Sequence, residues 1–185
     1  MTLRPFAAAT AVGAVGAVLL SLLATAPAQA LPPLNVVIDD ASEPGVAFDI
    51  TLVKLRAAPS DTRPAIVLVS HGRQVKSGDS LDVWFDLDGD KVPDIHVSGD
   101  AFSEYTVHKT KSFTKDGKDI SDLDVARLAM AGSTSKVRLF PAKLGSPVSF
   151  SVVVKSSRFD KPASTDDWAP STRKFSKPVL AMPLT

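Results

Sequence analysis

The chain has 185 residues, no cysteine and a formal net charge of +1, from 21 Lys and Arg against 20 Asp and Glu. The lack of cysteine excludes a disulfide scaffold, a thiol nucleophile and a lipidated N-terminal cysteine. The balanced and interleaved charges argue against a nucleic-acid-binding protein, which would carry a strongly basic face.

The first 30 residues are typical of a cleavable export signal. Arg4 precedes an uncharged stretch rich in Ala, Val and Leu, and Ala28-Gln29-Ala30 then places small residues at the positions that a signal peptidase reads. We expect cleavage before Leu31 and a secreted, extracellular protein. The alternative is a retained membrane anchor, which needs about 20 strongly apolar residues. This stretch is diluted by small and polar residues and is interrupted by Pro27.

Residues 31–185 would form the mature protein, and their length predicts one secreted domain. Arg4 is the only charged residue before this segment, so 20 Lys and Arg remain against 20 Asp and Glu and the mature chain is formally neutral. We expect it to bind neither nucleic acid nor, after signal cleavage, a membrane. The pattern leaves its oligomeric state open.

Runs of β-branched and alternating apolar residues dominate the mature segment, and 18 of its 20 acidic residues are Asp, which favours turns over helices. In the first run, Phe48, Ile50 and Leu52 alternate with polar positions, as in a half-buried strand. Gly, Pro, Asp and Ser separate the runs at intervals of about 10 to 15 residues, which favours antiparallel pairing. The runs are 48–53, 65–70, 81–85, 95–97, 105–108, 137–139 and 148–155. We therefore predict an all-β, two-layer antiparallel β-sandwich of the jelly-roll or immunoglobulin-like type.

The segment 121–131 has two interpretations. Ser121 and the apolar run that ends at Gly132 have the pattern of a capped helix. The same residues form a strand if 132–135 is a turn and 136–140 the partner strand. We favour the hairpin, because tertiary context overrides helix propensity.

The tail from 158 to 185 contains four prolines and little alternation. We predict a Pro-rich strap laid over the sandwich, because proline disfavours regular internal strands. Trp168, Phe175 and Val179 are the expected anchors.

One segment carries a recognisable ligand pattern. In 86–94, Asp86, Asp88, Asp90 and Asp94 occupy relative positions 1, 3, 5 and 9 around a glycine. A hard cation such as Ca²⁺ needs six to eight oxygen ligands, several of them charged, in one tight turn. We predict a Ca²⁺ site with these four ligands and a main-chain carbonyl near position 7.

The alternative is a metal-free turn rich in Asp and Gly, both common turn residues. The helix-loop-helix calcium motif has Gly at position 6 and Glu at position 12, where this chain has Lys91 and Val97. The flanking segments are predicted strands, which excludes an EF-hand.

The run 84–90, followed by 93–95, resembles the Asp-rich hairpin of uncharacterised secreted actinobacterial β-sandwich proteins and of calcium-stabilised extracellular modules. Phe48-Asp49-Ile50, the turn 167–170 and the segment 175–179 resemble the same group, and the resemblance covers about 36–180. It implies a sandwich fold and export but no activity. The lack of cysteine departs from relatives that carry a disulfide.

The remaining motifs do not predict a catalytic or zinc site. The His71-Gly72 pair lacks the nucleophile elbow of an α/β-hydrolase. His96 and His108 lie on other predicted strands, without the close pair that would anchor a zinc site. Asp39-Asp40 and Asp166-Asp167 would complete a second cation site if the ends of the domain meet, although Asx turns explain them more simply.

We expect a non-catalytic secreted module that binds an unidentified extracellular or cell-envelope component. The alternative is a carbohydrate- or cell-wall-binding domain with an exposed aromatic platform formed by Trp84 and Trp168. A hydrolase with Asp and His in a pocket is a third, less favoured hypothesis.

Overall fold

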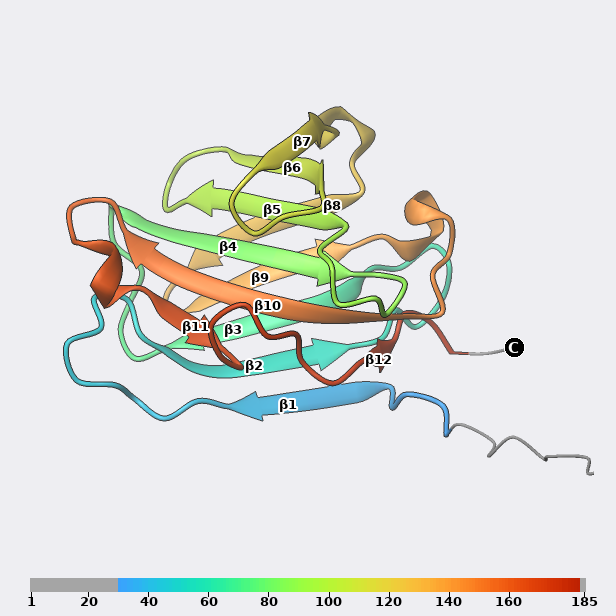
Figure 1. The fold of residues 1–185 in the computed structure, drawn as a ribbon, viewed down its shortest axis with the longest axis horizontal. Coiled ribbons are helices and arrows are strands. Elements are labelled where there is room, and N and C mark those ends of the chain that lie inside the picture. Colours follow the sequence, from blue (N-terminus) through green and yellow to red (C-terminus); the bar gives the residue numbers. More distant parts are fainter. Residues whose placement is uncertain (1–29, 184–185) are drawn as a thin grey trace, which may run out of the picture. The chain divides into compact units, whose positions relative to one another are not determined.

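A computed structural model describes residues 30–183, and Figure 1 shows their arrangement. The expected signal peptide therefore lies, except for Ala30, outside the described residues. Leu31–Thr185 cluster as one compact unit by their contacts. Within the part of the chain that the structure describes, no helix is both long and apolar enough to cross a membrane.

The first sheet has five antiparallel strands in the order β1-β2-β3-β9-β8. Their bounds are β1 Asn35–Asp39, β2 Ile50–Arg56, β3 Ala65–His71, β8 Ala126–Ala131 and β9 Thr134–Leu139. In Figure 1 the strands β8 and β9 of this sheet lie behind β4 and β5 of the second sheet.

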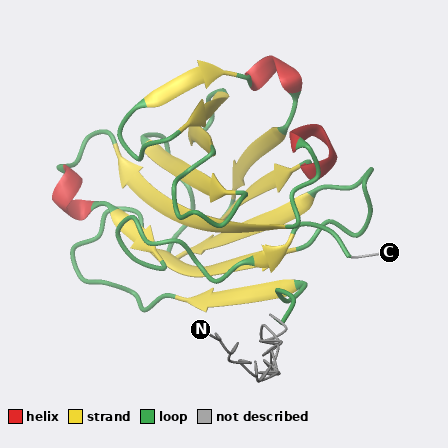
Figure 2. Cartoon of the chain, turned by 45° about the vertical axis from the view of Figure 1, so that its right-hand side comes forward, coloured by secondary structure: helices red, strands yellow, loops and turns green. Residues whose placement is uncertain are grey.

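The second sheet runs β11-β10-β4-β5-β6-β7, and β12 pairs with the other end of β10. Its strands are β4 Asp79–Asp86, β5 Ile95–Asp100, β6 Tyr105–Thr110, β7 Asp116–Asp119, β10 Ser149–Arg158, β11 Asp167–Ala169 and β12 Val179–Leu180. Three short 3-10 turns, η1 Ser121–Leu123, η2 Pro141–Leu144 and η3 Ala163–Thr165, are the helical elements of residues 30–183 (Figure 2). The prediction of an all-β chain with two antiparallel sheets is confirmed.

The core lies between the two sheets, because the strands alternate between inward apolar and outward polar residues. In β3, Ala65, Val67 and Val69 are fully buried, and in β4 the same holds for Leu81, Val83 and Phe85. Each large apolar side chain that leaves water stabilises the fold by about 1.5–3 kcal/mol. The sequence predicts this alternation for β4, whereas 66–69 is a continuous apolar run in which the sequence does not mark the inward face.

The inward face of β2 differs from the prediction. The register against β3 shifts between Ile50 and Leu52, which is the signature of a β-bulge. After the bulge the buried positions are Val53 and Leu55, whereas Leu52 is half-buried. The prediction that Leu52 faces inward with Ile50 is therefore wrong, since one extra residue reverses the faces of the residues that follow it.

The segment 121–131 resolves into two elements. Its first residues form the short turn η1, and Ala126–Ala131 form β8, which pairs antiparallel with β9. Gly132 lies in the connecting turn with φ of +58°, a backbone conformation that glycine adopts without steric cost. The hairpin interpretation is confirmed.

The outer face of β4 is also covered. Trp84 points away from the core, yet only 3% of its surface is exposed. The indole of Trp168 on β11 stacks on it at 5.6 Å between centroids, and Phe113 contacts it edge-on at 5.5 Å. Phe175 packs in turn against Phe113. These aromatic contacts explain why β4 is largely buried on both faces.

Candidate metal centre

The loop between β4 and β5 carries the Asp-rich segment. Asp86 is the last residue of β4, and Asp94 directly precedes β5. Gly89 and Lys91 have φ of +83° and +65°, so the chain turns sharply between them. Asp94 N–H donates to the carbonyl of Phe85 at 2.7 Å, and the Asp94 carbonyl accepts from Thr110 N–H at 2.9 Å. The loop is thereby fixed to both β4 and β6.

Three of the four predicted ligands converge. Carboxylate oxygens of Asp86, Asp88 and Asp94 lie within 4.8 Å of one another, and this is the one such group among residues 30–183. Oxygens on opposite sides of a Ca²⁺ ion, each at about 2.3–2.6 Å from it, are about 4.6–5.2 Å apart. The spacing therefore fits Ca²⁺. Asp90 is not in the group, and its carboxylate instead accepts a hydrogen bond from Val92 N–H at 2.7 Å.

Backbone amides orient the three carboxylates. Asp86 accepts from Gly89 N–H at 2.7 Å and from Lys91 N–H at 3.2 Å. Asp94 accepts from Leu87 N–H at 2.8 Å, and Asp88 accepts from the amide two residues later at 3.1 Å. Each carboxylate has about four acceptor sites, so capacity for a cation remains after these bonds.

The three carboxyl groups differ in their surroundings. Asp86 is only 2% exposed, and burial raises its pKa above the ordinary value despite the amide donors. Asp88 is exposed, and the hydrogen bond from the Asp90 amide lowers its pKa. A buried carboxylate is costly to charge without a nearby cation, and a bound divalent ion would offset that cost at Asp86.

Lys111 is a member of the site that the sequence did not indicate. Its ammonium lies 2.6 Å from the Asp94 carboxylate, and this contact raises the pKa of Lys111. Lys111 follows β6, which pairs with β5, so the contact arises from sheet pairing between residues 17 positions apart. The Lys111 side chain is about two-thirds exposed, and a cation at this site would compete with its ammonium for Asp94. This competition would make any cation binding weak rather than tight.

The three histidines lie in different environments. His71 Nε2 and Ser135 Oγ are 2.8 Å apart in the interior, and burial lowers the pKa of His71 to about 4. His96 and His108 are cross-strand neighbours on β5 and β6. His96 is held by two carboxylates and covered by Trp84. None of the three belongs to the acidic group described above.

Of the four aspartates predicted for a second cation site, Asp40 and Asp167 come close to each other. Burial, followed by the charge of Asp167, raises the pKa of Asp40 to about 6. Asp167 accepts hydrogen bonds from the amides of Ile50 and Trp168, as expected for a structural turn residue. Among the described residues these side chains do not form a cluster with metal-ligand spacing.

Comparisons with protein-family models, with curated proteins and with solved structures found no match to this chain.

Proposed function

We propose that this chain is a secreted, non-catalytic β-sandwich module that is stabilised by Ca²⁺ and binds an extracellular or cell-envelope component. The observation that carries the proposal is the convergence of Asp86, Asp88 and Asp94 in a loop fixed between two strands. Export rests on the signal-like pattern of residues 1–30, and extracellular fluid supplies the Ca²⁺ that weak sites need.

The proposal extends to the type of fold. We place the chain with the secreted actinobacterial β-sandwich proteins that its Asp loop resembles, and we assign it a jelly-roll or immunoglobulin-like sandwich. Three connections that cross between the sheets, β3 to β4, β7 to β8 and β9 to β10, support this assignment. We interpret 158–185 as the strap. Trp168 stacks on Trp84, and Val179 pairs with Phe150, which supports this role.

Two alternatives have less support. A carbohydrate-binding platform needs exposed, flat aromatic rings, whereas Trp84 is 3% exposed and its ring is covered by other aromatic groups. A hydrolase needs an accessible base. His71 is buried beside Phe48, and both ring nitrogens of His96 are bound by carboxylates, which favours structural roles for both.

Thermal unfolding with chelator and with millimolar Ca²⁺ tests the cation site. Extracellular modules bind Ca²⁺ with dissociation constants of about 10⁻⁴–10⁻³ M. At ten times that concentration, ligand linkage predicts a rise in Tm of about 3–6 °C. Asp88→Asn should lose most of this rise, while Asp61→Asn, an exposed aspartate in another loop, should keep it. Mg²⁺ should act more weakly, since it requires a smaller octahedral shell.

Equal Ca²⁺ responses in the wild type and Asp88→Asn, or no response in the wild type, would reduce the loop to an ordinary turn. Export is tested separately by N-terminal sequencing and intact mass of protein recovered from culture medium. The expected first residue is Leu31. Recovery of the chain only in membranes, with Met1 retained, would contradict secretion.

A further inference from the structure

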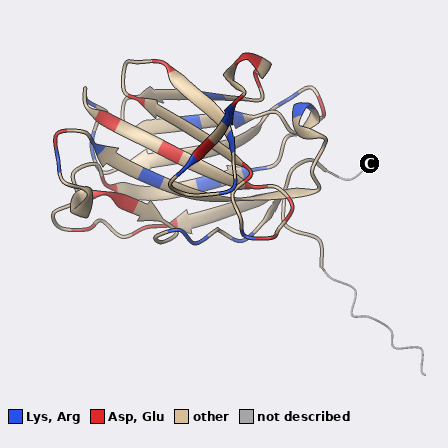
Figure 3. Ribbon diagram, turned by 45° about the horizontal axis from the view of Figure 1, so that its top comes forward, with Lys and Arg blue, Asp and Glu red and all other residues tan. Residues whose placement is uncertain are grey.

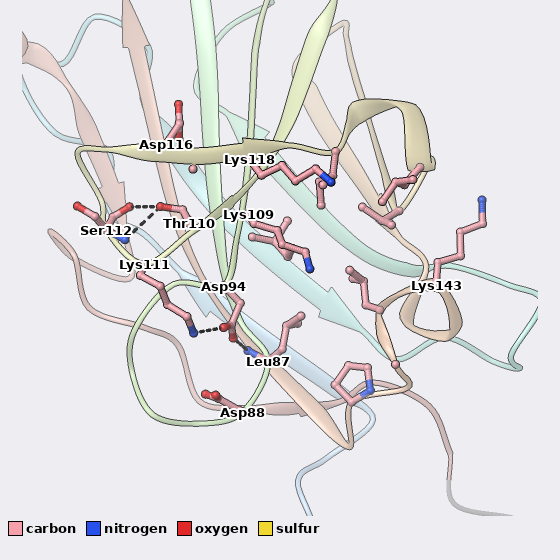
Figure 4. A pocket seen from close by; sticks show the side chains of 18 of the residues that line it. Leu87, Asp88, Asp94, Lys109, Thr110, Lys111, Ser112, Asp116, Lys118 and Lys143 are labelled. Atoms are coloured by element: carbon pink, nitrogen blue, oxygen red, sulfur yellow. Dashed lines mark hydrogen bonds and ion pairs between the residues drawn. The ribbon is translucent and has the colours of Figure 1, made fainter.

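A large cavity opens beside the Asp loop, and residues of both β7 and η2 line it. Its volume is about 870 Å³, within the range of small-molecule sites. The β4–β5 loop, β6, β7 and the residues around η1 and η2 contribute its walls, and Figure 4 shows the side chains that line it. Neither the sequence patterns nor the cation site accounts for this cavity.

The base of the cavity is apolar. Ile95, Ile120 and Val125 line it and also belong to the core between the sheets. Leu87 and Leu144 continue this surface outward. Leu123, a further lining residue, is 52% exposed. An apolar lining of this kind gains free energy when an aliphatic chain displaces water from it.

The rim of the cavity is cationic. Five lysines line it, namely Lys109, Lys111, Lys115, Lys118 and Lys143. Lys111 is paired with Asp94, and Lys143 with Asp124. The other three form no ion pair with any residue between 30 and 183. In Figure 4, Lys109 and Lys118 extend into the same part of the cavity from neighbouring strands.

The acidic residues of the lining do not cancel this charge. Asp94 is paired with Lys111, and Asp116 with His96. Asp88 is the remaining lining carboxylate, and it belongs to the cation group. The cavity thus combines an apolar base with unpaired ammonium groups at its mouth.

We propose that this cavity binds a single-chain amphipathic anion, with the aliphatic chain on the apolar base and the carboxylate between Lys109 and Lys118. A small inorganic anion would leave the apolar base unfilled, and a neutral lipid would leave the lysines unpaired. This inference rests on the proposed function, because it names the ligand of the binding module. It does not require the calcium site.

The anion cavity and the proposed Ca²⁺ site share two residues and are therefore coupled. Asp88 and Asp94 face the cavity and also belong to the cation group, so a bound Ca²⁺ would remove negative charge from the cavity wall. The anion should then bind more tightly with Ca²⁺ than with chelator, and by reciprocity the anion should strengthen Ca²⁺ binding.

Isothermal titration calorimetry with laurate, kept below its critical micelle concentration, tests the proposal. We expect saturable binding with one site per chain. Lys109→Glu/Lys118→Glu should weaken it by about tenfold or more, because two attractive charges become repulsive at close range. The control pair Lys54→Glu/Lys161→Glu changes two exposed lysines outside the cavity and should stay within about twofold of the wild type.

Three further probes separate the contributions. Acetate, which has the head group alone, and dodecanol, which has the chain alone, should both bind more weakly than laurate. Leu123→Gln should weaken laurate binding without changing the charge. Vesicles of anionic phospholipid should not bind the protein, since the site encloses one free chain.

The proposal is overturned by an absence of saturable laurate binding, by equal losses in the two lysine pairs, or by vesicle binding in place of laurate binding. These results are distinguishable from failure of the calcium proposal. A Ca²⁺-dependent Tm without laurate binding would overturn only the cavity assignment. Laurate binding that is unchanged by chelator, without a Ca²⁺ response, would overturn only the cation site.

Discussion

The imidazole of His96 lies parallel to the indole of Trp84, with ring centroids 4.5 Å apart and an interplanar angle of 1°. Its two nitrogens contact carboxylates on opposite sides, Asp82 at 3.0 Å and Asp116 at 2.7 Å. Lys155 completes the group with an ammonium 2.9 Å from Asp82. A protonated imidazole suits this position, because both the carboxylates and the aromatic face attract a cation.

This group predicts a pH-dependent stability. Burial alone would lower the pKa of His96, but the hydrogen bonds to Asp82 and Asp116 outweigh it and raise the pKa. His96 therefore stabilises the fold fully below its unfolded pKa of about 6.5, and this contribution is lost as the pH rises through the raised value. The stability difference between the wild type and His96→Gln should be largest near pH 5–6 and should shrink above pH 8.

Urea unfolding across this pH range measures the difference. The groups facing His96 are Asp82 on β4, Asp116 on β7 and His108 on β6. Burial opposes ionisation of Asp82, yet its bond to His96 holds its pKa at about 2, so its contribution is lost only as the pH falls from about 4 toward 2. A difference that is constant from pH 5 to 9 would contradict the charged state assigned to His96.

Asp40 predicts a loss of stability with rising pH in a lower pH range than His96. Burial and the charges of Asp167, Glu43 and Asp49 raise its pKa to about 6. A carboxyl group with a raised folded pKa binds its proton more tightly in the native state, so stability falls as the pH rises from about 4 through 6. Asp40→Asn should raise Tm at pH 7 and leave it nearly unchanged at pH 4. Equal shifts at both pH values would show that the effect is not electrostatic.

Asp79 predicts a large loss of stability on truncation. Its side chain is fully buried at the start of β4. The carboxylate accepts hydrogen bonds from both terminal nitrogens of Arg73, at 2.6 and 2.7 Å. Arg158 binds it from β10 at 3.0 Å. Asp79→Ala should lower the free energy of unfolding by about 3–5 kcal/mol, because breaking a buried pair leaves uncompensated charge.

The matched control is Asp160→Ala. Asp160 is the second carboxylate that pairs with Arg158, and it is exposed. Exposed ion pairs contribute little, so this variant should unfold almost as the wild type does. Similar losses in the two variants would mean that burial does not determine the contribution of Asp79.

Gly117 lies on β7 and lines the proposed ligand cavity. A Cβ at this position would lie 2.5 Å from the carbonyl oxygen of Lys109, which is closer than backbone contacts allow. Gly117→Ala should therefore loosen the pairing of β7 with β6 and speed amide exchange of Ile120, whose N–H donates to Val107. Laurate binding should weaken with it, since β7 forms one wall. Unchanged exchange at Ile120 would contradict this role of Gly117.

The sequence alone predicted features that depend on local alternation and turn chemistry. The inward residues of β4 follow directly from a period-two pattern, and the 126–139 hairpin follows from two apolar runs around Gly132. The sequence also predicted the Asp loop, because the three carboxylates that converge in the structure lie within nine residues of one another. Local spacing is sufficient for such features, since each strand or turn limits where its own side chains can point.

Features that depend on contacts between distant segments were decided only by the tertiary structure. Leu52 was assigned to the wrong face because a bulge depends on the partner strand β3, which no pattern within β2 reveals. Lys111 reaches Asp94 because sheet pairing brings β5 and β6 together, and Asp40 lies near Asp167 because the two sheets pack against each other. The lysine-rimmed cavity has the same origin. Its apolar base and its cationic rim come from separate segments of the chain, and only the packing of the two sheets places them around one space.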